Sequence, residues 1–368
     1  FGLFGLNVDS LEAAVLKRFG DRDKERNINA VKMGYSDGLS LQNQVNVSLP
    51  SLSKKADPDL YYIDGTTACG FGFLAGGCNF VASYPMSPST GVLNFMAEKS
   101  KEFTILLEQA EDEIAAFNMV LGAWYTGAKG LTTTSGGGFA LMSEGMSLSG
   151  MTEIPAVVYL AQRPGPATGL PTRSEQGDLA LAVNAGHGEF PRIILAPGDI
   201  EECVDLGYLA FELADRYQVP VVLLSDQYLA DSIQAVEAID FSRYVAHNYI
   251  VKSDSDYRRY VLNESGISPR SIPGYGEGLV CSVSDEHDER GQITESYRVR
   301  EEMVEKRHRK TESIRQAAIA PCVTGKGEIA IVGWGSSKGV IEEVLRELDD
   351  SRLMHLHFTW VFPLNSEH

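Results

Sequence analysis

Three common features are missing from the sequence, and each absence excludes a class of function. No apolar run among its 368 residues approaches the roughly 20 residues that span a bilayer, so no membrane is expected as a partner. The five cysteines form neither a Cys-x-x-Cys pair nor a cluster with histidine, so the chain offers no zinc or iron–sulfur site of its own. Lysine and arginine are too few to balance the acidic residues, and the formal charge of −18 argues against nucleic acid as a binding partner.

The length of the chain allows two or more domains. Residues 1–36 contain a helical pattern at 11–18 and a helical or extended tail at 27–35, which is too little to close a core alone. Residues 37–60 are rich in Ser, Asn, Gln, Pro and Lys and have little periodicity, which predicts a linker.

Strand and helix patterns alternate strictly through residues 61–240, which predicts an α/β fold with a parallel sheet covered on both faces. Residues 241–326 lose this alternation and end in a charged helix at 297–318. Residues 327–368 begin a new alternation, with a strand at 328–333, a helix at 338–348 and a strand at 353–362. This last piece is expected to be the start of a second α/β domain that is cut short.

Four runs of unusual composition each follow a strand pattern and precede or open a helix. They are Tyr-Pro-Met-Ser-Pro-Ser-Thr at 84–90, Glu-Gln-Ala-Glu-Asp-Glu at 108–113, Thr-Thr-Thr-Ser-Gly-Gly-Gly at 132–138 and Arg-Pro-Gly-Pro-Ala-Thr-Gly-Leu-Pro-Thr at 163–172. Because parallel strands end at a common edge, all four runs should meet at the carboxyl edge of the sheet, where open α/β sheets bind ligands.

Taken together and in this order, the four runs resemble the alpha subunit of 2-oxoacid:ferredoxin oxidoreductases, particularly the 2-oxoglutarate type. The resemblance is dense over residues 60–240 and continues to Gly-Trp-Gly-Ser at 333–336. In some members a gamma domain is fused ahead of alpha, and residues 1–36 look like the tail of such a domain.

The resemblance implies a thiamine diphosphate enzyme whose pyrimidine-binding domain lies at residues 61–240. In this family the diphosphate, its Mg2+ and a [4Fe–4S] cluster belong to a partner beta subunit, and the assembly is expected to be a dimer of heterodimers. The implied reaction is oxidative decarboxylation of a 2-oxo acid, reversible in principle. Coenzyme A takes the acyl group and ferredoxin takes the electrons. Such low-potential chemistry suggests a cytoplasmic enzyme.

Glu113 is the candidate catalytic residue. Taken alone, Glu111, Asp112 and Glu113 could simply favour the start of a helix through its dipole. The resemblance instead implies that the Glu113 carboxylate exchanges a proton with N1′ of the cofactor. Tyr84 and Pro85 would line the cofactor, although they are as well explained by the shape of the loop.

Ser87, Arg163 and Thr172 are the candidate substrate-binding residues. A hydroxyl and a guanidinium group can hold the carboxylate of a 2-oxo acid. In the family this arginine binds that carboxylate, and Thr172 lies in the loop that shapes the pocket. A surface ion pair is the alternative for Arg163. Many members carry Thr where this chain has Ser87, which leaves the preferred substrate side chain open.

Two further features have more than one interpretation. Glycines 136–138 could let the backbone approach a ligand closely or could form a tight turn before a helix at 139–148. His187 lies toward the site in the family, but a neutral structural histidine is the alternative.

Other functions stay open at this point. The substrate could be pyruvate or a branched 2-oxo acid. A non-oxidative thiamine enzyme would share the glutamate and the sheet, but such enzymes usually hold both cofactor-binding halves in one chain, and a Gly-Asp-Gly…Asn motif does not occur here. The non-enzymatic alternative is a scaffold subunit that only positions a partner.

Overall fold

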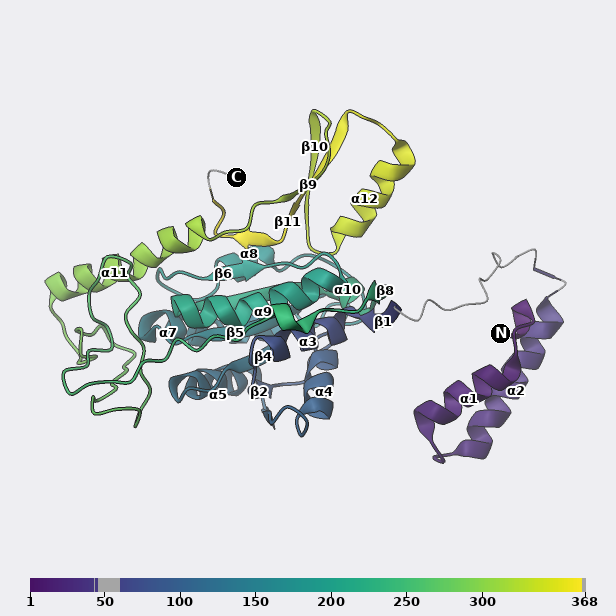
Figure 1. Ribbon diagram of the computed structural model, residues 1–368, viewed down its shortest axis with the longest axis horizontal. Helices are drawn as coiled ribbons and strands as arrows, with labels where there is room; N and C mark the ends of the chain where they lie inside the picture. The colour runs from purple at the N-terminus through teal and green to yellow at the C-terminus, as the bar shows by residue number, and fades with distance from the viewer. Residues whose placement is uncertain (43, 46–59, 366–368) are drawn as a thin grey trace. The chain divides into compact units, whose positions relative to one another are not determined.

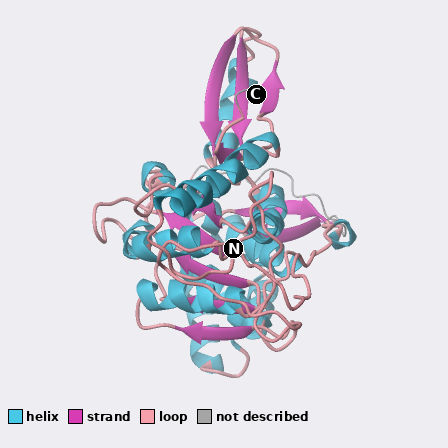
Figure 2. Ribbon diagram, turned by 90° about the vertical axis from the view of Figure 1, so that its left-hand side faces the viewer, coloured by secondary structure: helices cyan, strands magenta, loops and turns pink. Residues whose placement is uncertain are grey.

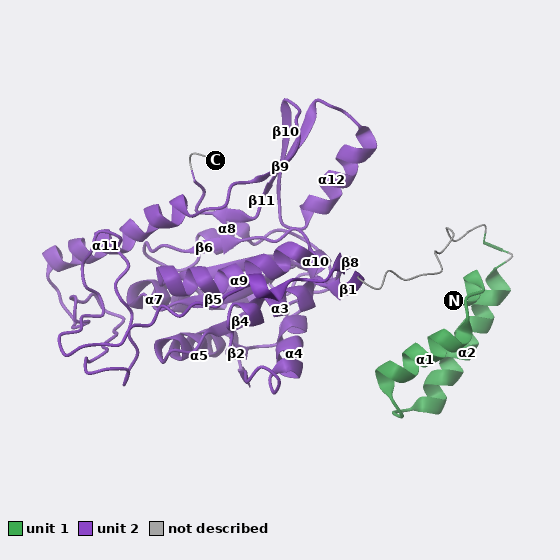
Figure 3. Ribbon diagram, in the orientation of Figure 1, with its two compact units in different colours: residues 1–59 green, residues 60–368 purple. Residues whose placement is uncertain are grey.

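The computed structural model describes residues 1–42, 44–45 and 60–365, which belong to two compact units, residues 1–59 and 60–368 (Figure 3). The first unit contains a short 3-10 turn, η1 (Gly2–Phe4), and the helices α1 (Val8–Phe19) and α2 (Lys24–Leu41). No residue of these two helices is buried, in agreement with the expectation that this piece cannot close a core alone.

Helix α2 continues through residues 37–41, where a linker was expected. The reason is close packing between two glycines. A Cβ atom on Gly38 would lie 2.7 Å from the backbone nitrogen of Leu3, and one on Gly2 would overlap the carbonyl oxygen of Tyr35. This contact between the turn and the helix holds the extra residues in helical conformation. Residues 46–59 of the expected linker lie outside the described residues.

The second unit is built on a seven-stranded sheet with the strand order β12-β6-β7-β5-β4-β2-β3. All neighbouring strands are parallel except β12, which is antiparallel to β6. Every residue of β4 to β7 is buried, as expected for a parallel sheet covered on both faces. The strands are β2 (Phe80–Ser83), β3 (Leu106–Gln109), β4 (Gly130–Thr134), β5 (Ala156–Gln162), β6 (Ile193–Leu195), β7 (Pro220–Asp226) and β12 (Trp360–Phe362).

Helices cover both faces of this sheet (Figures 1 and 2), which confirms the predicted α/β class. Helix α3 packs on α4 and on α9, and α5 packs on α6 and α7. In the part of the chain that the structure describes, no helix is long and apolar enough to cross a membrane. The bounds are α3 (Gly65–Ala75), α4 (Thr90–Lys99), α5 (Glu113–Tyr125), α6 (Gly136–Leu141), α7 (Ser143–Thr152), α8 (Leu179–Val183), α9 (Ile200–Tyr217) and α10 (Gln227–Asp231).

Two strands outside the large sheet were not expected from the sequence. β1 (Leu60–Asp64) and β8 (Ile233–Glu237) form an antiparallel ladder of their own. The two segments lie at opposite ends of the alternating region, so no local hairpin signal marks the pairing. The side chain of Asp64 then accepts a hydrogen bond from the backbone N–H of Thr67, at 2.7 Å, and caps α3.

The C-terminal segment forms a small sheet and then returns to the large one. β9 (Cys322–Gly325) pairs with β11 (Leu353–Phe358), which also pairs with β10 (Ile329–Trp334), and α12 (Ser337–Leu348) connects β10 to β11. The single strand expected at 353–362 is therefore wrong. It divides at Thr359, and β12 continues as the antiparallel neighbour of β6 because Trp360, 1% exposed, is buried in the main core.

Residues 240–295 have little regular structure, as predicted, apart from η2 (Phe241–Arg243) and isolated bridges. The charged helix α11 (Tyr297–Gln316) packs on the main domain through a buried cluster of charged side chains. Lys306 donates to both carboxylate oxygens of Glu153, at 2.6 and 2.8 Å, and Lys310 pairs with the same carboxylate. All three side chains are at most 1% exposed.

Replacement of Glu153 by Gln should strongly destabilise the protein. Burial lowers the pKa of Lys310 to about 7, and the two ammonium groups hold the pKa of Glu153 below its usual range against the effect of burial. Without the carboxylate, two buried lysines lose their counter-ion, which should cost about 3 kcal/mol of unfolding free energy in urea titrations. Glu302→Gln, which breaks the exposed Arg298–Glu302 pair, is the control and should cost less than about 0.5 kcal/mol. Equal losses in the two variants would contradict this account.

Candidate active site

The four runs identified in the sequence do meet at one edge. They lie at the carboxyl ends of β2, β3, β4 and β5, which are neighbours in the order β5-β4-β2-β3; Figure 1 labels β5, β4 and β2. The end of β2 is fixed to β4 because the Ser83 hydroxyl accepts a hydrogen bond from the backbone N–H of Thr133, at 2.8 Å. The edge is therefore a rigid platform for the loops that start from it.

Arg163 and Ser87 lie at the same edge, as expected, and a hydrogen bond that was not predicted joins them. The guanidinium group of Arg163 donates from Nη1 to the backbone carbonyl oxygen of Ser87, at 2.5 Å. Arg163 is only 9% exposed, so the alternative of a surface ion pair is wrong. Because the contact uses the main chain of Ser87, it does not depend on whether Ser or Thr occupies that position.

Thr172 lies on an exposed loop, outside the residues that line the cavity at Arg163. The loop folds back on itself, because the backbone N–H of Leu170 donates to the carbonyl oxygen of Pro164, at 3.1 Å. Gly169 is required at this return. Its φ is +53°, and a Cβ atom there would lie 1.7 Å from the same carbonyl oxygen.

Glu113 is the buried carboxylate of the site. It is 3% exposed, and its Oε1 atom has no hydrogen-bond partner within the described residues. Burial raises the pKa of Glu113, the neighbouring Asp112 adds to the rise, and Thr134 and Arg163 oppose it. Asp112 itself caps α5, since its carboxylate accepts from the backbone N–H of Ala115 at 2.7 Å. The capping role belongs to Asp112, and the Glu113 side chain is free for another one.

The three glycines at 136–138 form the first turn of α6, so the expected turn before a helix beginning at Phe139 is wrong. The missing side chains explain the early start. A Cβ atom on Gly138 would lie 2.2 Å from both Glu113 Oε1 and Thr134 Oγ1, and one on Gly136 would lie 2.3 Å from Asp178 Oδ1. The glycines let the helix begin directly against two carboxylates.

A cavity of about 200 Å3 opens beside Arg163. Its polar lining includes Ser135 and Asp178, neither of which was singled out from the sequence. Ser135 lies in the Thr-Thr-Thr-Ser-Gly-Gly-Gly run, which could have drawn attention to it. Asp178 precedes α8 in a stretch without a recognisable motif, so only the fold brings it to the site.

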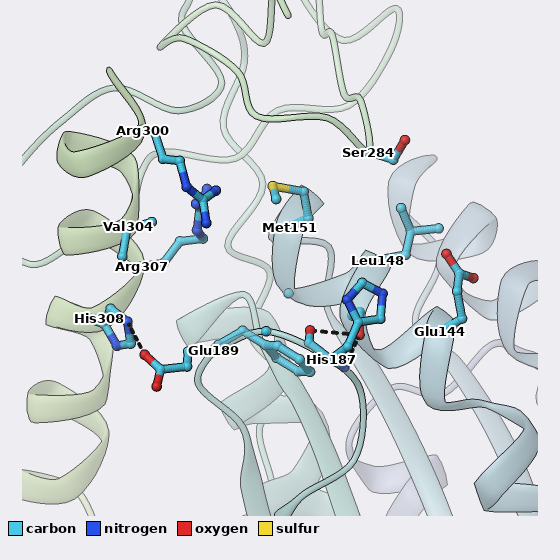
Figure 4. A pocket seen from close by; sticks show the side chains of 14 residues that line it. Glu144, Leu148, Met151, His187, Glu189, Ser284, Arg300, Val304, Arg307 and His308 are labelled. Carbon is cyan, nitrogen blue, oxygen red and sulfur yellow. Dashed lines mark hydrogen bonds and ion pairs between the residues drawn. The ribbon is translucent and has the colours of Figure 1, made fainter. Parts of the chain in front are cut away.

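The remaining candidates are less directly involved. Tyr84 is 39% exposed and Pro85 is half-buried at the start of the loop after β2, so their contact with a cofactor stays a prediction. His187 lies away from Arg163. It lines a larger cavity of about 460 Å3 together with Arg300 and Arg307 of α11 (Figure 4).

Comparisons with known proteins identify the family. Residues 72–306 match the family described as pyruvate flavodoxin/ferredoxin oxidoreductase, thiamine diphosphate-binding. The chain is 36% identical to 2-oxoacid:ferredoxin oxidoreductase 1, subunit alpha, of Sulfurisphaera tokodaii, over 99% of this chain and 60% of that protein. It is 31% identical to the 2-oxoglutarate synthase subunit KorA of Methanothermobacter thermautotrophicus, over 82% of each.

A solved structure is also similar. The 2-oxoglutarate:ferredoxin oxidoreductase from Magnetococcus marinus, with 2-oxoglutarate, coenzyme A and succinyl-CoA bound, superimposes with a TM-score of 0.87 at 33% identity, over 99% of this chain and 65% of that one. The chain thus spans less than two thirds of the length of this protein and of the Sulfurisphaera relative.

Replacement of Gly138 by Ala should lower the thermal unfolding temperature. The added methyl group would overlap the Glu113 carboxylate and the Thr134 hydroxyl, and overpacking of this kind costs about 1–3 kcal/mol. Gly137→Ala is a matched control, because a Cβ atom there meets only the carbonyl oxygen of Ala167, at 3.6 Å, and alanine favours a helix. The control should be neutral or slightly stabilised in calorimetry. A Gly138→Ala variant as stable as this control would show that the carboxylate is not held against the helix.

Proposed function

The chain belongs to the pyruvate flavodoxin/ferredoxin oxidoreductase family, and we propose that it is the alpha subunit of an enzyme that oxidatively decarboxylates a 2-oxo acid with thiamine diphosphate. One observation carries the proposal. A buried carboxylate, Glu113, ends in an oxygen for which the described residues offer no hydrogen-bond partner, at the edge of the sheet where ligands bind.

The described residues fit the pyrimidine end of thiamine diphosphate. A buried carboxylate oxygen without a partner is costly unless a ligand supplies one, and the ring N1′ of the cofactor can do so. Burial raises the pKa of Glu113, which is the direction expected for a carboxyl group that must hold and release a proton. The cofactor, when bound, supplies the nucleophilic carbon and accepts the electrons of the bond to carbon dioxide.

The residues of this chain have separable roles in the proposal. Glu113 exchanges a proton with N1′. Arg163 binds the substrate carboxylate, held in place by its hydrogen bond to the carbonyl oxygen of Ser87. The loop that carries Thr172 covers the substrate. Tyr84 and Pro85 shape the opposite wall next to the cofactor.

Other components would come from a partner. The relatives carry the name subunit alpha, which supports a beta subunit, and we assign to it the cofactor diphosphate, Mg2+ and a [4Fe–4S] cluster. Coenzyme A as acyl acceptor, ferredoxin as electron acceptor, assembly as a dimer of heterodimers and a cytoplasmic location belong to the same proposal. The structural neighbour with bound coenzyme A and succinyl-CoA supports the first of these.

We propose 2-oxoglutarate as the substrate. The 2-oxoglutarate synthase relatives and the neighbour with bound 2-oxoglutarate support this choice over pyruvate or a branched 2-oxo acid. The test is anaerobic reduction of a viologen dye by the full-length chain purified with its beta partner, given thiamine diphosphate, coenzyme A and one 2-oxo acid at a time. Reduction with pyruvate alone would keep the reaction and change the substrate. No reduction by any 2-oxo acid, with cofactor and cluster bound, would favour a non-oxidative thiamine enzyme or a scaffold.

Replacement of Glu113 by Gln should lower kcat in this assay by about 10²–10⁴-fold, the usual loss when a positioned proton-transfer group is removed. Glu111→Gln serves as the control, because Glu111 is an exposed acid in the same loop. It should keep wild-type activity. A scaffold subunit would lose nothing with either change, so equal activities of the two variants would contradict the catalytic role.

A further inference from the structure

Two residues that line the cavity beside Arg163 have buried polar atoms to which no role has been assigned. Ser135 is 0% exposed, yet its hydroxyl finds no hydrogen-bond partner in the described chain. The Oδ2 atom of Asp178 is likewise buried and unpaired within residues 60–365. Apart from these two residues and Arg163, the lining consists of glycine, alanine, proline and leucine.

Leaving both groups unpaired in one cavity is unfavourable. A buried donor or acceptor without a partner costs about 1–3 kcal/mol, and most buried polar groups are satisfied in native proteins. Arg163 lines the same cavity. A ligand that accepts a hydrogen bond from the Ser135 hydroxyl and pairs with the carboxyl group of Asp178 would satisfy both groups.

Asp178 is held in this position by the rigid part of the fold. Its backbone N–H donates to Oε1 of Gln162 at 3.0 Å, and Nε2 of Gln162 donates to the carbonyl oxygen of Ser225 at 3.0 Å. Its carboxyl group lies against Gly136, where any side chain would collide with Oδ1. Ser135 directly follows β4, so both groups are fixed by the ends of strands rather than by the exposed loop.

We propose that Ser135 and Asp178 complete the carboxylate-binding site of Arg163, which rests on the proposed function. A carboxylate has two oxygens and can accept about four hydrogen bonds. In this arrangement Arg163 supplies the charge and Ser135 donates its hydroxyl. Asp178 donates from its protonated carboxyl group, because an ionised one would repel the ligand. The ligand class is therefore a carboxylate that enters a small and otherwise apolar cavity.

The surroundings of Asp178 shift its pKa in the direction that favours the protonated form. Burial raises the pKa of Asp178, the nearby Glu175 raises it further, and only Arg163 lowers it. A bound substrate carboxylate would add another negative charge and raise it again. The protonated form exists below this pKa, so substrate binding should weaken as the pH rises through it.

The test uses the complete enzyme with its beta subunit and follows kcat and KM for 2-oxoglutarate over a series of pH values. Ser135→Ala and Asp178→Ala should each raise KM about tenfold while kcat changes little, since one hydrogen bond to a charged group is lost. Asp178→Asn keeps a donor but cannot ionise. Its KM should stay near the wild-type value at acidic pH and should not rise with pH. Asp231→Asn, on an exposed part of α10, is the control.

The outcomes separate this inference from the proposed function. If the wild-type enzyme is active and the KM of Ser135→Ala and Asp178→Ala is unchanged, the inference fails while the proposed function stands. The same holds if the KM of Asp178→Asn depends on pH as in the wild type. Without wild-type turnover the proposed function fails. In that case, calorimetric titration of the wild type and of Ser135→Ala with 2-oxoglutarate tests the inference by itself. Equal affinity of the two proteins, or no binding to either, overturns the inference. Circular dichroism of each variant identifies any loss caused by misfolding.

Discussion

The approach of α6 to the Glu113 carboxylate is the contact on which the site depends. It requires a glycine at 138, a helix that begins immediately after β4, and Asp112 as the cap of α5. Each of these positions the carboxylate without neutralising it. The same first turn, through Gly136, also fixes the carboxyl group of Asp178. The first turn of α6 thus lies against both carboxyl groups, Glu113 through Gly138 and Asp178 through Gly136.

Buried charges in this protein fall into two groups. Glu153 is fully paired by Lys306 and Lys310 and contributes to stability by holding α11 on the main domain. Glu113 and Ser135 are buried and Asp178 is partly buried, and each has a polar atom that the described chain leaves unpaired. The first group stabilises the fold, and the second is the group that we propose binds a ligand.

Much of the fold could be predicted because β-branched runs and amphipathic runs alternate strictly, which constrains the sheet and the edge at which Glu113, Ser87 and Arg163 meet. The failures have physical causes. The pairing of β1 with β8 joins distant segments, and the division at Thr359 depends on the burial of Trp360. Residues 37–41 are helical because two glycines allow close packing. Asp178 reaches the site only through the tertiary fold, and the role of the Ser87 carbonyl oxygen cannot be read from a side-chain pattern.

The ladder between β1 and β8 has a consequence for the evolution of such chains. The segment that follows unit 1 enters the second unit as β1, which pairs with β8 and not with the large sheet. A domain gained, exchanged or lost by gene fusion ahead of Leu60 therefore leaves the register of the large sheet unchanged. Chains with different N-terminal domains can therefore share the same large sheet and the loops at its carboxyl edge.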